Sequence, residues 1–309
     1  MRRSDILDRA KGAIVGMAAG DALGAGYEFT SPGPTADISM KGGGRFGWEP
    51  GEWTDDTAMG TCILDVAANG TLSPSAVGDG FLEWFNDNPK DAGVQTSAVL
   101  GPATSGADLA GVAAAFQATK PEAAGNGSLM RTAAVALAHP GDHAAIAVSA
   151  RAISDLTHPH PSCADACVIW SIAIDHAIHH AEFDVGVGLG FVPEERRSYW
   201  EDLIAEAEAG PPTKFTPNGW VITAFQAAWS SIVNTPVPRQ EPADHLRNTL
   251  VAAVRIGNDT DTVAAIAGML LGARWGVQAI PPEWQRLLHG WPGWTTDDLK
   301  SRAVIAFEG

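Results

Sequence analysis

The sequence predicts an all-α protein built as one compact domain. Alanine-rich segments with apolar residues three and four positions apart recur along all 309 residues, which is the period of a helix face. Stretches that alternate apolar and polar residues, as half-buried strands do, are nearly absent. No disordered linker separates two regions of different composition, so we expect residues 1–309 to form a single domain.

The expected helices follow from the apolar periods in chain order, and they are too rich in Ala and Gly to be surface rods. The first is read as a helix rather than a signal peptide, because Asp5, Asp8 and Lys11 interrupt its apolar run. A long Gly-rich loop at residues 31–50 follows, and it is either a mobile flap or a plain surface loop. The helical segments are residues 9–23, 58–70, 107–120, 142–156, 163–183 and 219–234, with breaks at residues 186–197, 210–219 and 235–242.

The bulk properties describe a soluble protein of the reducing cytoplasm. Hydrophobic residues make up 45% of the chain, the mean hydropathy is -0.01, and no apolar stretch is long enough to cross a membrane. Three cysteines provide no disulfide framework. The net charge of -16 disfavours nucleic acid backbones and anionic membranes. A phosphorylated substrate would therefore need cations or backbone donors inside its pocket.

The first acidic motif is Thr-Asp-Asp-Thr at residues 54–57, immediately before an apolar helix. Thr54 can cap that helix, and the helix dipole favours Asp55 and Asp56 in its first turn. A cap needs only one side-chain oxygen, however, and adjacent carboxylates repel each other unless solvent or a cation separates them. Acids and hydroxyls together are the hard ligands that Mg²⁺, Mn²⁺ or Ca²⁺ requires. Capping and metal binding both remain open for this motif taken alone.

The second acidic motif, Asp-Thr-Asp-Thr at residues 259–262, repeats the pattern far downstream, after Gly257 and Asn258. The run after it is so apolar that the helix is expected to be interior, where acids are costly without a counter-charge. If the two helix starts converge, their four carboxylates supply enough oxygen ligands for two divalent ions. The pair of motifs therefore predicts a metal site better than either motif does alone.

These motifs belong to an ordered set that resembles the ADP-ribosylglycohydrolase family, in particular its bacterial branch that includes the dinitrogenase reductase-activating enzyme. The set spans nearly the whole chain, and its order is that of the family. The matching segments are GAIVGMAAGDALGAGYEF (12–29), WTDDTAM (53–59), PKDAG (89–93), GNGSLMRTAAVAL (125–137), SDLTHPHPSCADA (154–166) and IGNDTDTVAAIAGMLLGARWG (256–276).

The resemblance implies a compact single-domain orthogonal helical bundle that holds two Mg²⁺ or Mn²⁺ ions. It also implies hydrolysis of the C1″ glycosidic bond of ADP-ribosyl conjugates, on a protein side chain or a related derivative, with release of ADP-ribose. Glu28 is the first choice for acid–base catalysis, and the motif carboxylates of Asp55, Asp56 and Asp261 are expected to assist. The metal ligands that the resemblance implies are Thr54, Asp55, Asp56, Asp259, Asp261 and Thr262.

The resemblance also implies a set of substrate contacts. GNGSLMR reads as a loop entering a helix, whose glycines let backbone N–H groups face an anion, and the family makes it the pyrophosphate cradle. Arg131 could contact phosphate or brace the first acidic motif by an ion pair, and we expect the brace. A zinc site of His158, His160, Cys163 and Cys167 is the rival reading of that region. The substrate-binding residues are expected to be Asp91, Asn126, Gly127, Ser128, Met130 and His158.

Other readings stay open at this stage. A magnesium-dependent all-α terpene synthase would need a third acid where Met59 stands and a glutamate where Ile266 stands. A non-catalytic ADP-ribose-binding member of the family is the other alternative, although the metal aspartates are all present. Asn258 replaces a common second glycine, which leaves the ligands intact and bears on the approach of the ribose. We expect a monomer, no membrane partner, and nucleic acid only as an ADP-ribosylated end, while the leaving group stays open.

Overall fold

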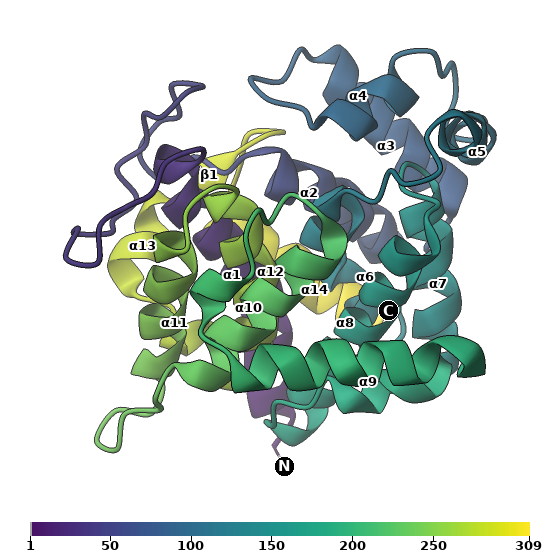
Figure 1. Ribbon diagram of the computed structural model, residues 1–309. Coiled ribbons are helices and arrows are strands. Elements are labelled where there is room, and N and C mark those ends of the chain that lie inside the picture. Colours follow the sequence, from purple (N-terminus) through teal and green to yellow (C-terminus); the bar gives the residue numbers. More distant parts are fainter. Residues whose placement is uncertain (1) are drawn as a thin grey trace.

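The computed structural model describes residues 2–309, and it confirms the all-α prediction (Figure 1). The longer helices are α1 (Arg3–Gly24), α2 (Asp55–Ala68), α3 (Pro74–Asn86), α4 (Val94–Leu100), α5 (Leu109–Thr119), α6 (Ala133–Ala138), α7 (His143–Asp155), α8 (Pro161–His180), α9 (Glu194–Ala209), α10 (Val221–Asn234), α11 (Asp244–Arg255), α12 (Thr260–Trp275), α13 (Pro282–Leu287) and α14 (Thr296–Glu308). Short 3₁₀ helices lie at η1 (Ala25–Tyr27), η2 (Asn126–Arg131), η3 (Gly186–Phe191), η4 (Pro212–Lys214) and η5 (Val277–Ala279).

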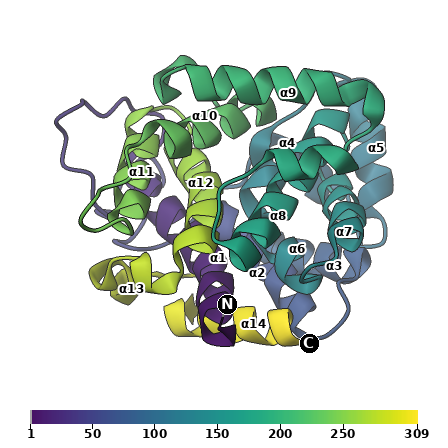
Figure 2. The same ribbon diagram turned by 90° about the horizontal axis from the view of Figure 1, so that it is seen from below.

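Helices α1 and α12 lie side by side at the centre of the molecule (Figures 1 and 2). Their backbones touch: a Cβ atom on Gly12 would lie 2.2 Å from the carbonyl oxygen of Gly272. At the other end of the seam, a Cβ atom on Gly24 would lie 2.4 Å from the backbone nitrogen of Asp261. The seam is therefore antiparallel, and a side chain at Gly12 or Gly24 of α1 would collide with the backbone of α12. It fixes the end of α1 against the start of α12, where the second acidic motif lies.

The remaining helices surround this pair. Helix α8 packs on α7, α6, α10 and α12, and its Trp170 donates a hydrogen bond of 3.0 Å from Nε1 to the carbonyl of Ile266. Helix α9 lies across one end and packs on α10 (Figure 2). Helix α14 returns to α1 and α2, and an ion pair between Arg3 and Glu308 joins the two ends of the chain. One core of buried apolar side chains extends from Ala10 to Ala306.

Extended structure is minor in the described part of the chain. Strands β1 (His289–Gly290) and β2 (Trp294–Thr295) form a short antiparallel hairpin. An isolated bridge pairs Thr30 with Asn258 and ties the loop after η1 to the start of the second acidic motif. No helix within residues 2–309 is long and apolar enough to cross a bilayer.

Two local expectations differ from the structure. The segment GNGSLMR forms the 3₁₀ helix η2 before α6 begins, rather than a loop that enters an α-helix directly. The break expected at residues 186–197 contains η3 and the first turn of α9. Helix α9 escaped the sequence analysis because Arg, Glu and Asp dominate it and only Trp200, Ile204 and Ala207 are buried. Its polar composition hides the helical period of its apolar residues.

Candidate active site

The first acidic motif is held in place by an aspartate that the sequence analysis did not assign. Asp21 lies in α1 and is completely buried. Its carboxylate accepts hydrogen bonds from the backbone nitrogens of Thr54 and Thr57, both at 3.0 Å, and from Thr57 Oγ1 at 2.6 Å. Burial raises the pKa of Asp21 to about 6. The available signal was a lone acid in the apolar part of α1 after Lys11, where a carboxylate is costly without such partners.

Because Asp21 binds the start of α2, the motif's own aspartates are free for another role. Thr54 caps the helix by accepting a bond of 3.4 Å from the backbone nitrogen of Asp56. Asp56 Oδ1 accepts a bond of 3.1 Å from Thr262 Oγ1, which joins the two motifs directly. Asp56 Oδ2 is buried and has no hydrogen-bond partner within residues 2–309. Asp55 is also buried and faces the cleft described below.

The second motif is held by amides rather than by a carboxylate. Asn218 accepts from the backbone nitrogen of Asp259 at 3.0 Å, and Asn126 donates to Asp259 Oδ2 at 2.7 Å. Thr260 Oγ1 donates to the carbonyl of Gly24 at 2.9 Å, across the glycine seam. Asp261 is buried, and its Oδ1 has no partner in the described chain. Asn218 gave no signal in the sequence, because it lies in an irregular loop far from the motif.

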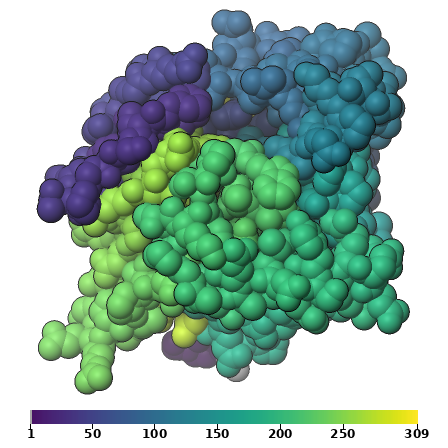
Figure 3. Space-filling model, viewed as in Figure 1, coloured from purple at the N-terminus to yellow at the C-terminus, as the bar shows by residue number. Residues whose placement is uncertain are grey.

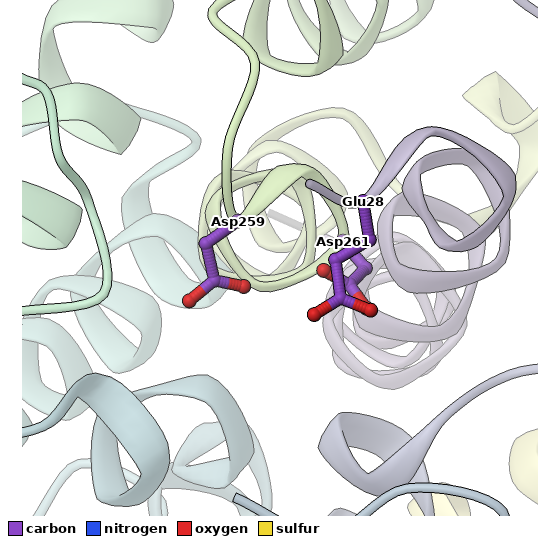
Figure 4. A group of neighbouring side chains, drawn as sticks. All are labelled: Glu28, Asp259 and Asp261. Carbon is purple, nitrogen blue, oxygen red and sulfur yellow. The ribbon is translucent and has the colours of Figure 1, made fainter. Parts of the chain in front are cut away.

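The carboxylates of Glu28, Asp259 and Asp261 converge at the start of α12 (Figure 4). One ligand oxygen from each lies within 4.8 Å of the others. Glu28 follows η1, and its Oε2 is buried without a hydrogen-bond partner among residues 2–309. Hard oxygen ligands with unpaired lone pairs fit a divalent cation. The structure thus brings Glu28, for which the sequence suggested acid–base catalysis, into the same cluster as the predicted metal ligands.

The cluster is strongly charged and lacks a counter-ion of its own. No Lys, Arg or His within residues 2–309 forms an ion pair with Glu28 or with the motif aspartates. Burial and then the charge of Asp259 raise the pKa of Glu28 to about 9, and burial and then Asp91 raise that of Asp55 to about 7. Burial raises the pKa of Asp56 and Asp261 well above the usual range. Bound cations would remove this penalty, so the donor set fits divalent metal ions.

A cleft of about 480 Å³ opens over the cluster. Figure 3 shows it as a hollow between the purple and yellow-green segments on one side and the blue and teal segments on the other. The predicted site residues that line it are Glu28, Asp55, Asp91, Asn126, Gly127, Met130, His158, Asp259, Asp261 and Thr262. Phe29, Gln95, Phe116 and Lys120 also line it; Phe29 ends the matching segment 12–29, and no sequence motif includes the other three.

Three predicted residues do not line this cleft. Thr54 and Asp56 lie beneath it, as the hydrogen bonds above require. Ser128 is turned into the core, where its Oγ accepts from Ser154 Oγ at 2.9 Å and from Cys167 Sγ at 3.5 Å. The tight 3₁₀ path of η2 sets this direction, which differs from the expected helix start. The side chain of Ser128 therefore does not face a ligand in the cleft.

The expected brace between Arg131 and the first motif takes a different form. Arg131 is completely buried and forms no ion pair with any carboxylate in residues 2–309. Its Nη1 instead donates to Met59 Sδ at 3.3 Å, and its guanidinium lies 4.3 Å from the ring centroid of Phe81. The predicted ion pair is thus absent, and Arg131 contacts α2 through a thioether.

The four residues of the alternative zinc site, His158, His160, Cys163 and Cys167, form local hydrogen bonds and packing contacts. Cys163 Sγ donates to the carbonyl of Gly125 at 3.4 Å, and both Cys163 and Cys167 are buried in α8. His160 caps α8 by accepting from the backbone nitrogen of Ser162 at 3.1 Å. The ring of His158 packs on Gly127, where a Cβ atom would lie 2.8 Å from His158 Cε1. These side chains are thus engaged in capping and packing.

A smaller cavity of about 160 Å³ adjoins the cleft and shares Asp55 and Asp91 with it. Its other lining consists of four tryptophans and two acids, together with neutral residues: Trp48, Trp53, Trp84, Trp291, Glu52, Asp87, Thr54, Ala58, Asn88 and Pro89. Lys90 also lines it and forms an ion pair of 2.6 Å with Glu52. The loop at residues 31–50 reaches this cavity through Trp48 and does not line the main cleft. Its possible role as a flap over the cleft stays a hypothesis.

Sequence and structure comparisons relate the chain to one family. The sequence model of the ADP-ribosylglycohydrolase family matches residues 2–308. The ADP-ribosyl-dinitrogen reductase glycohydrolase of Rhodospirillum rubrum is 31% identical over 301 residues, which cover 92% of this chain and 91% of the relative. The ADP-ribosylarginine hydrolase Tri1 of Serratia proteamaculans is 27% identical over 284 residues, covering 91% and 75%. A solved structure of an ADP-ribosylglycohydrolase-related protein complex is 26% identical, with a TM-score of 0.75 over 99% of both chains.

Proposed function

Because this chain belongs to the ADP-ribosylglycohydrolase family, we propose that it hydrolyses the C1″ glycosidic bond of ADP-ribosyl conjugates with the help of two divalent cations. The broader activity, that of a glycohydrolase acting on ADP-ribosyl groups, follows from the family and from the relatives. The observation that carries the metal dependence is the group of buried, unpaired oxygens: Glu28 Oε2, Asp56 Oδ2 and Asp261 Oδ1. Such charge is stable in a buried position only beside a counter-charge.

The cations would be Mg²⁺ or Mn²⁺, held between the two acidic motifs. Thr54, Asp55 and Asp56 supply one side, and the other side consists of Asp259, Asp261 and Thr262. When bound, the cations would neutralise the cluster and add Lewis acidity toward the substrate ribose. The hydrogen bond between Thr262 and Asp56 keeps the two sides in register before any ion arrives.

The residues of the chain divide the remaining work. Glu28 would move a proton through its free Oε2, either from the attacking water or to the leaving group. The carboxylates of Asp55, Asp56 and Asp261 would stabilise an oxocarbenium-like transition state. Asn126, Gly127, Met130 and His158 line the part of the cleft in which the ADP portion would lie, and Asp91 lies where the leaving group would depart.

The smaller cavity favours a cationic leaving group, and arginine is the first candidate. Tryptophan faces attract guanidinium ions, and Asp87 and Asp91 add negative charge, while the charge of Glu52 is paired with Lys90. Lys90 already places its ammonium 5.2 Å from the ring centroid of Trp48 in this cavity. Two of the relatives are named ADP-ribosylarginine hydrolase. A neutral leaving group such as serine would gain nothing from this charge.

The test is release of ADP-ribose from defined conjugates. We expect turnover of ADP-ribosylarginine with Mg²⁺ or Mn²⁺, slower turnover of ADP-ribosylserine, and none with EDTA. Tight ADP-ribose binding without turnover of any conjugate in a panel of arginine, serine, nucleic acid and small-molecule substrates would instead identify a non-catalytic member. Turnover that persists in EDTA would contradict the metal dependence.

A further inference from the structure

Arg131 is a buried cation without an anionic partner in the described chain. Its side chain is completely buried, its Nε has no hydrogen-bond partner within residues 2–309, and its contact with Met59 Sδ is weak. Its strong bond is the one from Nη2 to Thr157 Oγ1, at 2.6 Å. A buried guanidinium normally faces a carboxylate. The hydrogen bond to Thr157 is therefore the contact through which this buried charge can act on its surroundings.

The bond from Arg131 determines where the hydroxyl proton of Thr157 goes. A guanidinium only donates hydrogen bonds, so Thr157 Oγ1 accepts from it and must place its own proton elsewhere. Thr157 is completely buried, and the one other polar atom bonded to its Oγ1 in residues 2–309 is His158 Nδ1, at 2.7 Å. The hydroxyl therefore donates to Nδ1. The opposite direction would leave a buried hydroxyl proton without an acceptor, which is costly.

This direction fixes the tautomer of His158. Since Nδ1 accepts, the single proton of the neutral ring resides on Nε2. Burial and then the charge of Arg131 hold the pKa of His158 well below its usual value, so the ring stays neutral. Nε2 forms no hydrogen bond with any residue from 2 to 309, and it lies beside the glycines of η2: Cβ atoms on Gly127 and Gly125 would lie 3.0 and 3.4 Å from it. The ring lines the cleft.

We propose that Arg131 and Thr157 are positioning residues that hold His158 as a neutral Nε2–H donor directed at the pyrophosphate of the ligand. The identity of that anion rests on the proposed function, whereas the tautomer follows from the hydrogen bonds alone. The chain from Arg131 through Thr157 to His158 polarises each bond in turn and strengthens the last donor. The cleft thereby gains the effect of a buried positive charge that is fixed in position, at one ring nitrogen of His158.

The tautomer can be measured directly in the wild-type protein. With ¹⁵N-labelled histidine, the two ring nitrogens give distinct resonances, and those of His158 are assigned by their loss in His158→Gln. We expect a protonated Nε2 and an unprotonated Nδ1. A protonated Nδ1 would overturn the proposal, and this readout needs neither a metal ion nor turnover.

The effect on the ligand is measured with Thr157→Val, which keeps the shape of the side chain and removes the hydroxyl. We expect the dissociation constant of ADP-ribose, measured by calorimetry with Mg²⁺, to rise about tenfold, and the fixed tautomer to be lost. Thr157→Ser restores the hydroxyl and should restore both. Thr249→Val is the matched control, because Thr249 is equally buried and its hydroxyl has no partner in the described structure.

The outcomes separate this proposal from the proposed function. Unchanged ADP-ribose affinity in Thr157→Val, with an altered tautomer, would overturn the proposed role of the hydrogen bonds from Arg131 through Thr157 to His158. This holds even if the enzyme is fully active. An equal loss in Thr249→Val would reduce the effect to core packing and would also overturn it. If Thr157→Val does not fold, the tautomer of His158 in the wild-type protein still tests the proposal, since a protonated Nδ1 would overturn it. A confirmed tautomer together with no turnover of any conjugate would count against the hydrolase proposal alone.

Discussion

The two acidic helix starts are nearly the same in sequence, yet the structure supports them in different ways. The first, at residues 54–57, is held by the carboxylate of Asp21, which accepts from two backbone nitrogens and one hydroxyl. The second, at residues 259–262, is held by the amides of Asn126 and Asn218 and by the backbone of α1. The first support adds a negative charge to the cluster, whereas the second adds none.

This difference shows why capping does not account for the motifs. Asp21 binds two backbone nitrogens of the first start and Asn218 binds one of the second, and at both starts a motif carboxylate keeps a free oxygen in a buried position. Proteins rarely keep such groups unless a ligand completes them.

The largest expected effect comes from Asp261→Ala. This change removes one of the three carboxylates, those of Glu28, Asp259 and Asp261, that lie together at the start of α12. We expect turnover to fall by about a thousandfold or more, because residues of one catalytic cluster act as a unit. The fold should persist, because the variant removes a buried carboxylate whose Oδ1 has no hydrogen-bond partner in the described chain. Steady-state assays and circular dichroism measure the two effects.

The matched control is Asp297→Ala, which changes the second residue of α14 just as Asp261 is the second residue of α12. Asp297 is exposed, and this variant should keep wild-type turnover. If Asp261→Ala retained full activity, the second helix start could not be part of the site.

The next largest expected effect is the pH dependence of the free energy of unfolding of the metal-free protein. Folding raises the pKa of Asp21 to about 6, of Asp55 to about 7 and of Glu28 to about 9. Unfolded carboxyl groups titrate near about pH 4, so between about pH 4 and about pH 9 these three groups bind more protons in the folded protein than in the unfolded chain. The contribution of these three carboxyl groups to the free energy of unfolding therefore falls as the pH rises through this window, whereas the histidines whose pKa burial lowers, such as His158, act in the opposite direction.

Bound Mg²⁺ or Mn²⁺ should replace the protons as counter-charge and flatten this dependence. Urea unfolding at about pH 5 and about pH 8, with EDTA and with added metal, measures the change. Stability in EDTA that rises with pH over this window would show that the carboxylates are not repelling one another.

A smaller effect distinguishes the two supports. The carboxylate of Asp21 accepts three hydrogen bonds from Thr54 and Thr57. In Asp21→Asn, the amide nitrogen would face the donors of one of these residues and could not accept from them. We expect the free energy of unfolding to fall by about 2 kcal/mol. Asn218→Ala, its counterpart at the second start, should cost about 1 kcal/mol because it loses neutral bonds. Chemical denaturation with Mg²⁺ present compares them. Equal losses would remove the distinction between a charged and a neutral support.

The smallest effect is expected for Asn258→Gly. Asn258 has a φ of 63°, a left-handed conformation that glycine adopts freely, and its backbone forms the hydrogen bonds that join it to Phe29 and Thr30. The change should alter stability by less than about 0.5 kcal/mol and turnover by less than about twofold. A large rise in KM would instead show that this side chain contacts the ribose.

The sequence was sufficient for the features that local patterns encode. The periods of apolar residues predicted the all-α fold, and the repeated motifs led to the family. The residues that the sequence did not reveal act over long distances: Asp21 binds a helix start 33 positions away, and Asn218 holds Asp259 from 41 positions away. The direction of Ser128 and the route from Arg131 to Thr157 depend on the 3₁₀ path of η2 and on packing against α2 and Phe81, which no spacing rule describes.

Anomalous diffraction from crystals grown with Mn²⁺ tests most directly whether the two acidic helix starts meet to hold metal ions. We expect two anomalous peaks between residues 54–56 and residues 259–262, in contact with the free oxygens of Asp56 and Asp261. Crystals of Asp261→Ala should lose at least one of them. A map without peaks in this cluster, or with Mn²⁺ bound only elsewhere, would contradict the proposed site.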